Sequence, residues 1–575
     1  MINYTKNSLL KLTLCLLLLA GMNTTFAQTW NQLGMDMDGE TPNNQSGAAL
    51  SLSADGLTLA IGATGNYGSG SKAGHVRVYS LDTATWTQIG ADIDGEAAFD
   101  HSGVSISLSA DSMTVAIGAT GNNGNGAYSG HVRVYSFISG AWTQIGADID
   151  GEAADDLSGR SVSLSADGLT VAIGAPENDG NGSNAGHVRV YSLISGVWTQ
   201  QGADIDGEAT DDESGWSVSL SADSLTVAIG APNNDGNGQD AGHVRVFKLD
   251  TGAWIQQGAD IDGEAIGDLS GQSVSLSADG LTVAVGARYN DENGTDAGHV
   301  RVYELISGVW TQKGSDIDGE AADDRSGGSI SLSADGLTLA IGAQLNDGNG
   351  SNAGHVRIYK FTTGEWTQLG PDIEGEAMND ESGLSVNLSA DSLTVAVGAR
   401  FNDGNGNDAG HVRAYKFCPV DVSITNNAPT LTANTFGATY QWLDCDNNFD
   451  SIVGETSRSF IPRKNGNYAV AVSQNGCTGI SYCEAVHNAG LAENSFGNNF
   501  KLYPNPTDGN LHIEFGKTYK YTSITVTNQV GQEVLKKELG HAHSVDLNLD
   551  VMPGIYFLEI LSSKGHRALL KVVKQ

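Results

Sequence analysis

One unit of 56 residues occurs seven times between residues 28 and 417, with no insertion or deletion between its anchor residues. A Trp, the His of a Gly-His-Val-Arg run and the Asp of a Ser-Ala-Asp run all keep this spacing. They are Trp30, Trp86, Trp142, Trp198, Trp254, Trp310 and Trp366; His75, His131, His187, His243, His299, His355 and His411; and Asp55, Asp111, Asp167, Asp223, Asp279, Asp335 and Asp391. A fixed period of this length predicts a repeat architecture whose units pack on their neighbours.

Residues 158–213 show the pattern within one unit. Residues 161–165 alternate small polar residues with Val162 and Leu164, and residues 169–175 are apolar on both faces, as in a central strand. Residues 187–193 alternate again, and residues 198–205 complete the unit after a turn. Four antiparallel strands in each of seven units predict an all-β fold, a seven-bladed β-propeller. An open β-solenoid is the alternative, although its rungs are usually shorter.

The two ends of the repeat region complement each other. The region begins with a fourth strand, residues 30–34, and ends with a third strand, residues 411–417. The first segment is therefore expected to complete the last blade, which closes the ring and covers its free edge.

The charge of the chain is concentrated in the repeats. The whole chain has a formal charge of −37, and residues 28–417 contain 16 Lys and Arg against 53 Asp and Glu. A surface this acidic repels nucleic acid and anionic membranes, so both are excluded as direct partners. It attracts cations.

The N-terminus is typical of a secretory signal peptide, residues 1–27. Lys6 and Lys11 precede the apolar run 12–20, and Thr25-Phe26-Ala27 offers a cleavage site before Gln28. The apolar run is too short for a membrane span, and we expect no transmembrane segment elsewhere. The four cysteines after this segment lie between residues 418 and 483, in an export context that permits disulfides.

The repeats resemble the FG-GAP repeats of integrin-α-type propellers. The Gly-Ala-Pro element occurs as residues 174–176 and 230–232, is relaxed to Gly-Ala-Arg at 286–288 and 398–400, and Ser-Gly replaces Phe-Gly, as at 158–159. The resemblance implies a propeller over about two thirds of the chain. The family's calcium loop between the first two strands is reduced here to Ser-Ala-Asp-Gly or Ser-Ala-Asp-Ser, so its metal ligands are not carried over.

Acidic residues recur instead in two other loops of each unit. The fourth-to-first connection contains Asp-Ile-Asp-Gly-Glu, with weaker copies at residues 36–40 and 372–376. The second-to-third connection contains Asn-Asp-Gly-Asn-Gly in four units, with Asp179, Asp235, Asp347 and Asp403, and a variant with Asp291 in a fifth. Both connections should emerge on one rim. Alternating oxygen ligands with a Gly suit Ca²⁺, which predicts calcium as a cofactor; the alternative is that these residues cap turns and keep an exported protein soluble. The predicted ligands are Asp92, Asp94, Glu96, Asp148, Asp150, Glu152, Asp204, Asp206, Glu208, Asp260, Asp262, Glu264, Asp316, Asp318 and Glu320.

The repeated His, Arg and Trp are interpreted as structural. Seven equivalent copies argue against a catalytic role, because a catalytic site needs one place unlike the others. We expect each His to bond to the backbone or to the Ser-Ala-Asp carboxylate, each Arg to form an ion pair, and each Trp to pack between blades.

Two positions near the predicted channel mouth vary between the units. They follow the Ser-Gly pair and the Gly-Ala pair, and exposed Arg and aromatic residues in a concavity are good ligand contacts. Drift between duplicated blades is the alternative explanation. The predicted ligand-binding residues are Arg160, Trp216, Arg288, Tyr289, Arg400 and Phe401.

The segment after the repeats has a different character. Residues 440–443 and 466–470 suggest strands, and residues 418–485 resemble small Ig-like modules of exported Bacteroidetes-type proteins. Four cysteines allow three pairings, of which we favour Cys445–Cys477 with Cys418–Cys483; such bonds stabilise a small sandwich. We interpret the module as a spacer, followed by a linker at residues 486–498.

Residues 499–575 resemble the C-terminal sorting domain of the type IX secretion system. The resemblance rests on Leu502-Tyr503-Pro504-Asn505-Pro506, on Pro553-Gly554-Ile555-Tyr556, and on the basic end Lys571-Val572-Val573-Lys574. It implies a β-sandwich, passage across an outer membrane, and the type IX machinery as a partner. The alternative is a further Ig-like binding domain.

Together these features predict an exported binding or adhesion protein at the cell surface or outside the cell, whose ligand is a glycan or a protein and whose binding depends on calcium. No nucleophile elbow, phosphate-binding Gly loop or zinc-ligand spacing occurs, so we do not expect an enzyme. The alternatives are an extracellular polysaccharide lyase or hydrolase, which should have one blade with a unique acid/base pair, and a purely structural surface-layer protein.

Overall fold

A computed structural model describes residues 29–474, 477–486, 493–497 and 499–575. The predicted signal peptide lies outside these residues. Thr29–Cys418 form one compact unit, and the residues from Pro419 to Gln575 belong to a second. In the described part of the chain, no helix is both long and apolar enough to cross a membrane.

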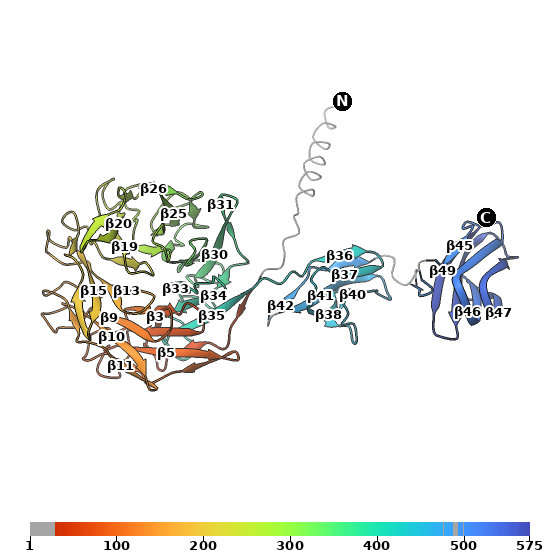
Figure 1. The fold of residues 1–575 in the computed structure, drawn as a ribbon, viewed down its shortest axis with the longest axis horizontal. Coiled ribbons are helices and arrows are strands. Elements are labelled where there is room, and N and C mark those ends of the chain that lie inside the picture. The colour runs from red at the N-terminus through yellow and green to blue at the C-terminus, as the bar shows by residue number, and fades with distance from the viewer. Residues whose placement is uncertain (1–28, 475–476, 487–492, 498) are drawn as a thin grey trace, which may run out of the picture. The chain divides into compact units, whose positions relative to one another are not determined.

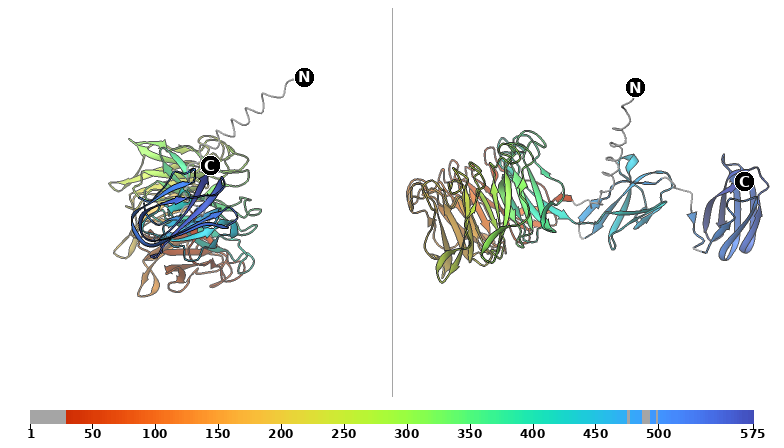
Figure 2. Two further views of the ribbon diagram at one scale, coloured as in Figure 1. Left: turned by 90° about the vertical axis from the view of Figure 1, so that its right-hand side faces the viewer. Right: turned by 90° about the horizontal axis from the view of Figure 1, so that it is seen from above.

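Thr29–Cys418 form seven antiparallel sheets, each of four strands and a short fifth one. Figure 1 shows these sheets arranged as a ring in chain order, and Figure 2 shows them from two further sides. The first strands of adjacent blades contact each other and line a central cavity. The prediction of a seven-bladed β-propeller is confirmed.

The first strands are β3 (Ser46–Leu52), β8 (Ser105–Leu108), β13 (Ser161–Leu164), β18 (Ser217–Leu220), β23 (Ser273–Leu276), β28 (Ser326–Leu332) and β33 (Ser385–Leu388). The second strands are β4 (Thr58–Ala63), β9 (Thr114–Ala119), β14 (Thr170–Ala175), β19 (Thr226–Ala231), β24 (Thr282–Ala287), β29 (Thr338–Ala343) and β34 (Thr394–Ala399). Every residue of the second strands is buried, as expected for an apolar strand inside a sheet between two other blades.

The third strands are β5 (His75–Asp82), β10 (His131–Ile138), β15 (His187–Ile194), β20 (His243–Asp250), β25 (His299–Ile306), β30 (His355–Thr362) and β35 (His411–Cys418). The fourth are β6 (Thr85–Gln88), β11 (Ala141–Gln144), β16 (Val197–Gln200), β21 (Ala253–Gln256), β26 (Val309–Gln312), β31 (Glu365–Gln368) and β1 (Thr29–Gln32). The short fifth strands are β7 (Ile93–Asp94), β12 (Ile149–Asp150), β17 (Ile205–Asp206), β22 (Ile261–Asp262), β27 (Ile317–Asp318), β32 (Ile373–Glu374) and β2 (Met37–Asp38).

The expectation of one continuous fourth strand over residues 198–205 is wrong. Strands β16 and β17 both pair with β15, but two residues of β15 lie opposite the four residues 201–204. Gly202 has a φ of 74° in this bulge, and a Cβ there would lie 2.9 Å from Cδ1 of Trp254 in the next blade. The bulge therefore makes room for the neighbouring Trp.

The ring is closed by the two ends of the repeat region, as predicted. β1 pairs with β35 from Thr29↔Cys418 to Gln32↔Tyr415, and β2 pairs with the same strand. Hydrogen bonds between neighbouring blades continue across this seam: Leu164 N donates to Ser107 Oγ at 2.9 Å, and at the equivalent place Leu52 N donates to Asn387 Oδ1 at 2.8 Å.

The module after the propeller contains two sheets. One is formed by β36 (Ile424–Asn427), β37 (Thr430–Ala433) and β40 (Ser459–Phe460), and the other by β38 (Thr439–Asp444), β39 (Asp450–Ser451), β41 (Gly466–Gln474), β42 (Cys477–Ile480) and β43 (Glu484–Val486). The 3₁₀ turn η1 (Cys445–Asn447) follows β38. Fully buried Trp442 stacks on Phe460 from the other sheet, with ring centroids 5.1 Å apart. The module is therefore a small β-sandwich.

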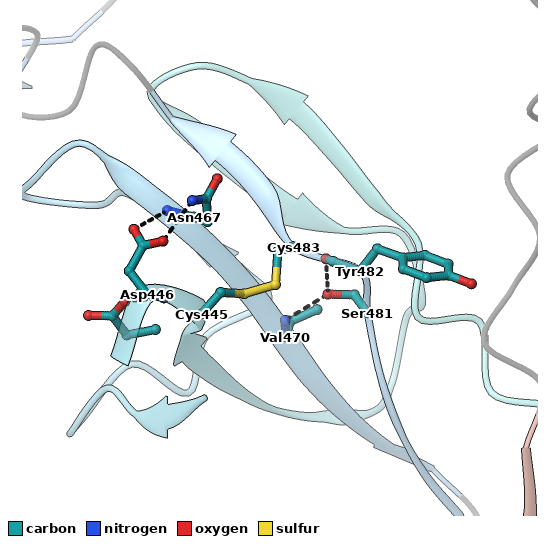
Figure 3. Close-up of a disulfide and its surroundings, with 8 residues drawn as sticks. Cys445, Asp446, Asn467, Val470, Ser481, Tyr482 and Cys483 are labelled. Carbon is teal, nitrogen blue, oxygen red and sulfur yellow. Dashed lines mark hydrogen bonds between the residues drawn. A yellow bond between two sulfur atoms is a disulfide. The ribbon is translucent and has the colours of Figure 1, made fainter. Parts of the chain in front are cut away.

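The predicted pairing Cys445–Cys477 with Cys418–Cys483 is wrong. Cys445 is bonded to Cys483 (Figure 3), and Cys418 and Cys477 are also in disulfides. The strand register explains the error: Asp444 lies beside Tyr468, where β43 begins, whereas Cys477 lies beside Gln474 at the opposite end of β41.

Replacing both Cys445 and Cys483 with Ser is expected to destabilise this module by about 4 kcal/mol, because the bond closes a loop with a sequence separation of 38 residues. Urea unfolding followed by the fluorescence of Trp442 measures the loss. Peptide mapping that links Cys445 to Cys477, or an unchanged unfolding midpoint, would contradict the assignment.

The C-terminal module is a six-stranded sheet around one apolar core. Its strands are β44 (Glu493–Asn494), β45 (Lys501–Tyr503), β46 (Asn510–Asn528), β47 (Glu533–Asn548), β48 (Gly554–Ser562) and β49 (Arg567–Lys574). Residues 493–496, assigned to the linker from the sequence, belong to this module, since β44 pairs with β49 and Phe496 lies in the core. Asn505 of the Tyr-Pro-Asn-Pro motif donates to Lys571 O at 2.7 Å and accepts from Val573 N at 2.9 Å, which fixes the motif on the last strand.

Candidate functional site: the acidic rim and the channel mouth

The two acidic loops of each blade meet on one rim of the propeller, as predicted. Asn181 in the second-to-third connection donates from Nδ2 to Gly207 O in the fourth-to-first connection, at 2.7 Å. The equivalent bond crosses the seam, where Asn405 donates to Gly39 O at 2.7 Å. The fourth-to-first loops of all seven blades and the second-to-third loops of five of them therefore contribute carboxylates to the same face.

The first Asp of each Asp-Ile-Asp-Gly-Glu loop is held within its own blade. Gln144 at the end of β11 donates from Nε2 to Asp148 Oδ1 at 2.6 Å, and the other oxygen, Oδ2, lies 3.9 Å from Nδ1 of His131. The Gln stands four residues before the Asp in all seven blades, and the bond is formed in each.

The Glu of the same loop reaches the next blade. Glu152 Oε1 lies 3.4 Å from Nη1 of Arg189, and Oε2 lies 3.9 Å from Nδ1 of His187. Arg189 also donates from Nη2 to the backbone oxygen of Asp150 at 2.8 Å. The carboxylates of one loop are thus divided between two blade boundaries, and calcium bound by a single loop remains a prediction.

Each repeated His lies beside carboxylates, but not those expected. The Ser-Ala-Asp carboxylate caps its own turn, since Asp167 Oδ1 accepts from Ser165 Oγ at 2.6 Å and from Leu169 N at 3.0 Å. His243 is 1% exposed, and its burial, followed by the charge of Arg245, lowers its pKa to about 4. The same two causes, in this order, lower the pKa of His75, His131, His187, His299, His355 and His411.

The repeated Trp and Arg join neighbouring blades, as expected. Trp198 donates from Nε1 to Ile145 O of the preceding blade at 2.8 Å, and every repeated Trp forms the equivalent bond. Each repeated Arg donates from Nη2 to a backbone oxygen of the preceding blade. Both residue types are therefore occupied in holding the ring together.

The central channel opens on this rim in a cavity of about 410 Å³. Its lining includes Arg160, Trp216, Arg288 and Arg400, four of the six predicted ligand-binding residues. Arg160 lies over Trp216, with its Cζ 4.2 Å from the ring centroid. Residues from different blades thus meet at this mouth.

The two remaining predicted residues, Tyr289 and Phe401, contact the arginines with their rings. Arg288 lies over Tyr289 at 4.7 Å and Arg400 over Phe401 at 4.4 Å, and neither ring lines the cavity. Sequence reasoning missed two further lining residues, Gln272 and Gln344. Gln272 follows a Ser-Gly pair and Gln344 follows a Gly-Ala pair, so the variation that identified the arginines also marks these positions.

Within the part of the chain that the structure describes, three side-chain atoms of the residues that line the mouth lack a hydrogen-bond partner. Among the described residues, Nε of Arg288, Nε of Arg400 and Oε1 of Gln272 are buried without a hydrogen-bond partner. Buried polar groups are normally paired, so these side chains retain unused hydrogen-bonding capacity.

Comparisons with known proteins identify two parts of the chain. Residues 147–191, 199–247 and 260–303 match the FG-GAP repeat, and residues 501–575 match the secretion system C-terminal sorting domain. The sequence matches no curated protein.

Two solved structures are similar at low identity. A putative 6-phosphogluconolactonase from Bacteroides uniformis matches with a TM-score of 0.44 and 16% identity, covering 64% of this chain and 93% of that chain. The Dos1 propeller matches with a TM-score of 0.37 and 13% identity, covering 67% of this chain and 95% of that chain.

The matched repeats lie inside the ring of similar 56-residue units, and the matched sorting domain lies within the C-terminal module. The chain is a β-propeller protein with FG-GAP repeats and a type IX C-terminal sorting domain, and it is exported across the outer membrane to the cell surface or the extracellular space.

Proposed function

We propose that this exported protein binds an extracellular glycan through an acidic group of that glycan, at the mouth of the propeller channel. The observation that carries the proposal is the cluster of Arg160, Arg288 and Arg400 around one cavity in a strongly acidic propeller. Of the 16 basic residues in the repeat region, seven are the repeated Arg that bind the preceding blade. Three of the other nine line this cavity.

The chemistry of the mouth suits a sugar with a carboxylate or a sulfate. A guanidinium binds either group through two parallel hydrogen bonds. Trp216 offers an aromatic face for a sugar ring, and the two glutamines offer amides for hydroxyl groups. The surrounding carboxylates repel long polyanions, so the site favours a ligand with one acidic end group.

We propose binding rather than catalysis because the seven blades are near-copies. A purely structural surface component is the other alternative; it would self-associate, whereas the proposed binder remains monodisperse without its ligand. Calcium dependence of binding is a further expectation, tested by comparing affinity and melting temperature in calcium and in EDTA.

Replacing Arg288 with Ala is expected to weaken binding of an oligosaccharide with a terminal uronic acid about tenfold or more, because a charge-assisted hydrogen bond contributes about 1.5–3 kcal/mol. Calorimetric titration measures the change. Lys360→Ala is the matched control, since it removes one positive charge from an exposed position on β30.

The neutral form of the same oligosaccharide should bind at least tenfold more weakly than the acidic form. Equal binding of the two forms, or an equal effect of the Arg288 and Lys360 variants, would overturn the proposal.

A further inference from the structure

Four potential metal ligands meet at one blade boundary. His299 begins β25, Asp316 precedes β27 of the same blade, Glu264 comes from the preceding blade, and Glu292 lies in the loop after β24. One ligand atom from each lies within 4.8 Å of the other three. Nδ1 of His299 is 3.9 Å from Glu264 Oε2 and 3.9 Å from Asp316 Oδ2.

Glu264 and Asp316 each contact another side chain through the carboxylate oxygen that does not face His299. Glu264 Oε1 lies 3.1 Å from Nη1 of Arg301, and Asp316 Oδ1 accepts a hydrogen bond from Gln312 Nε2. The second oxygen of each group therefore stays directed at the imidazole. Partners that fix ligand orientation in this way are typical of metal sites.

The imidazole of His299 is buried and has a ring nitrogen free to bind a metal ion. Its side chain is 1% exposed, and within the described residues its Nδ1 is buried without a hydrogen-bond partner. In the tautomer that carries its proton on Nε2, Nδ1 presents a lone pair to two carboxylate oxygens, which is unfavourable unless a cation lies between them.

Glu292 distinguishes this boundary from the other six. The equivalent positions are all glycine: Gly68, Gly124, Gly180, Gly236, Gly348 and Gly404. The loop forms without a side chain there, so the turn does not explain the carboxylate. Its carboxylate lies with those of Glu264 and Asp316 at this boundary. Glu292 thus adds a fourth donor where like charges already crowd.

We propose that His299, Glu264, Asp316 and Glu292 bind a divalent first-row transition-metal ion, such as Mn²⁺ or Zn²⁺. An ion midway between Nδ1 and either facing oxygen lies about 2 Å from both atoms, which is the usual length of such metal–ligand bonds. Ca²⁺ takes six to eight oxygens at longer distances and has little preference for imidazole. The ion would join two adjacent blades and neutralise their facing carboxylates.

Titration of the metal-stripped chain with Mn²⁺, followed by electron paramagnetic resonance, and with Zn²⁺, followed by calorimetry, tests the proposal. We expect one equivalent to bind at least tenfold more tightly than any other, with millimolar Ca²⁺ unable to displace it. Glu292→Gly, which gives this blade the residue of the other six, should remove the tight equivalent and leave the fold unchanged by circular dichroism.

Gly236→Glu provides the converse test, because His243, Glu208 and Asp260 surround the equivalent boundary and Gly236 takes the place of Glu292. This change should add a second tight equivalent. Absence of a tight equivalent, an unchanged titration of the Glu292→Gly chain, or displacement by Ca²⁺ at comparable concentration would each overturn the proposal.

Discussion

Lowering the pH from 6.5 to 4 in EDTA is expected to destabilise the propeller strongly. His75, His243, His299, His355 and His411 have pKa values of about 4 in the folded chain, against 6.5 for the unfolded residue. Between these values the unfolded chain binds protons that the folded chain excludes, so stability falls as the pH falls and is constant above about 6.5. The loss is about 3 kcal/mol for each fully shifted His.

The groups around each His set the size of this effect. Burial and the charge of Arg245 lower the pKa of His243, whereas the charges of Asp260 and Asp212 raise it. The pKa values of Asp38, Asp94, Asp262 and Asp318 and of seven propeller glutamates are raised in the folded chain, mainly by burial, and proton uptake by these groups offsets part of the loss as the pH falls. The net slope is therefore the contribution of the histidines reduced by the proton uptake of these carboxyl groups.

Urea unfolding at several pH values between 4.5 and 7.5 measures the dependence. His243→Gln provides the matched variant, because it removes one titrating group and should reduce the slope by about one proton. A free energy of unfolding that stays constant from pH 7 to 4.5 would show that these histidines are accessible to protons in the folded chain.

A chain that lacks residues 29–38 is expected to lose the cooperative unfolding of the propeller. Without β1, one edge of β35 is unpaired, and Trp30 no longer packs on Phe417 at 5.0 Å or donates to Leu369 O at 2.8 Å. Loss of a buried Trp alone costs about 3–5 kcal/mol, and the strand pairing and buried Met37 add to this.

Calorimetry and size-exclusion chromatography measure the consequence, since an exposed strand edge favours association between chains. A synthetic peptide of residues 29–40 should restore the melting transition by strand addition, whereas a scrambled peptide should not. A truncated chain that stays monomeric with an unchanged melting temperature would mean that the closing strand contributes little.

The sequence was sufficient to predict the ring of blades but not the side-chain contacts between neighbouring blades. The period of 56 residues and the alternation within one unit predicted the sheets, their number and the closing strand, because these depend on local patterns. Glu152 was assigned to the same site as Asp148, yet it lies against Arg189, 37 residues further on, because neighbouring blades place these residues together.

Two other errors have related causes. The pairing of Cys445 depends on which end of β41 each later cysteine reaches, and spacing along the chain does not contain that register. Glu292 was not predicted as a ligand because its loop differs from the shared Asn-Asp-Gly-Asn-Gly pattern at this single position. The signal is present in the sequence, since the other six repeats all have glycine at the position of Glu292.

The seam of the ring is offset from the boundaries of the repeat. Because the last blade takes its outer strands from the start of the region, recombination between any two interior repeats adds or removes a whole blade and leaves both closing segments intact. Each new boundary would regain the same Trp and Arg contacts, since these recur in every blade. Blade number is thus a quantity that duplication can change in single steps, while the closure of the ring is inherited unchanged.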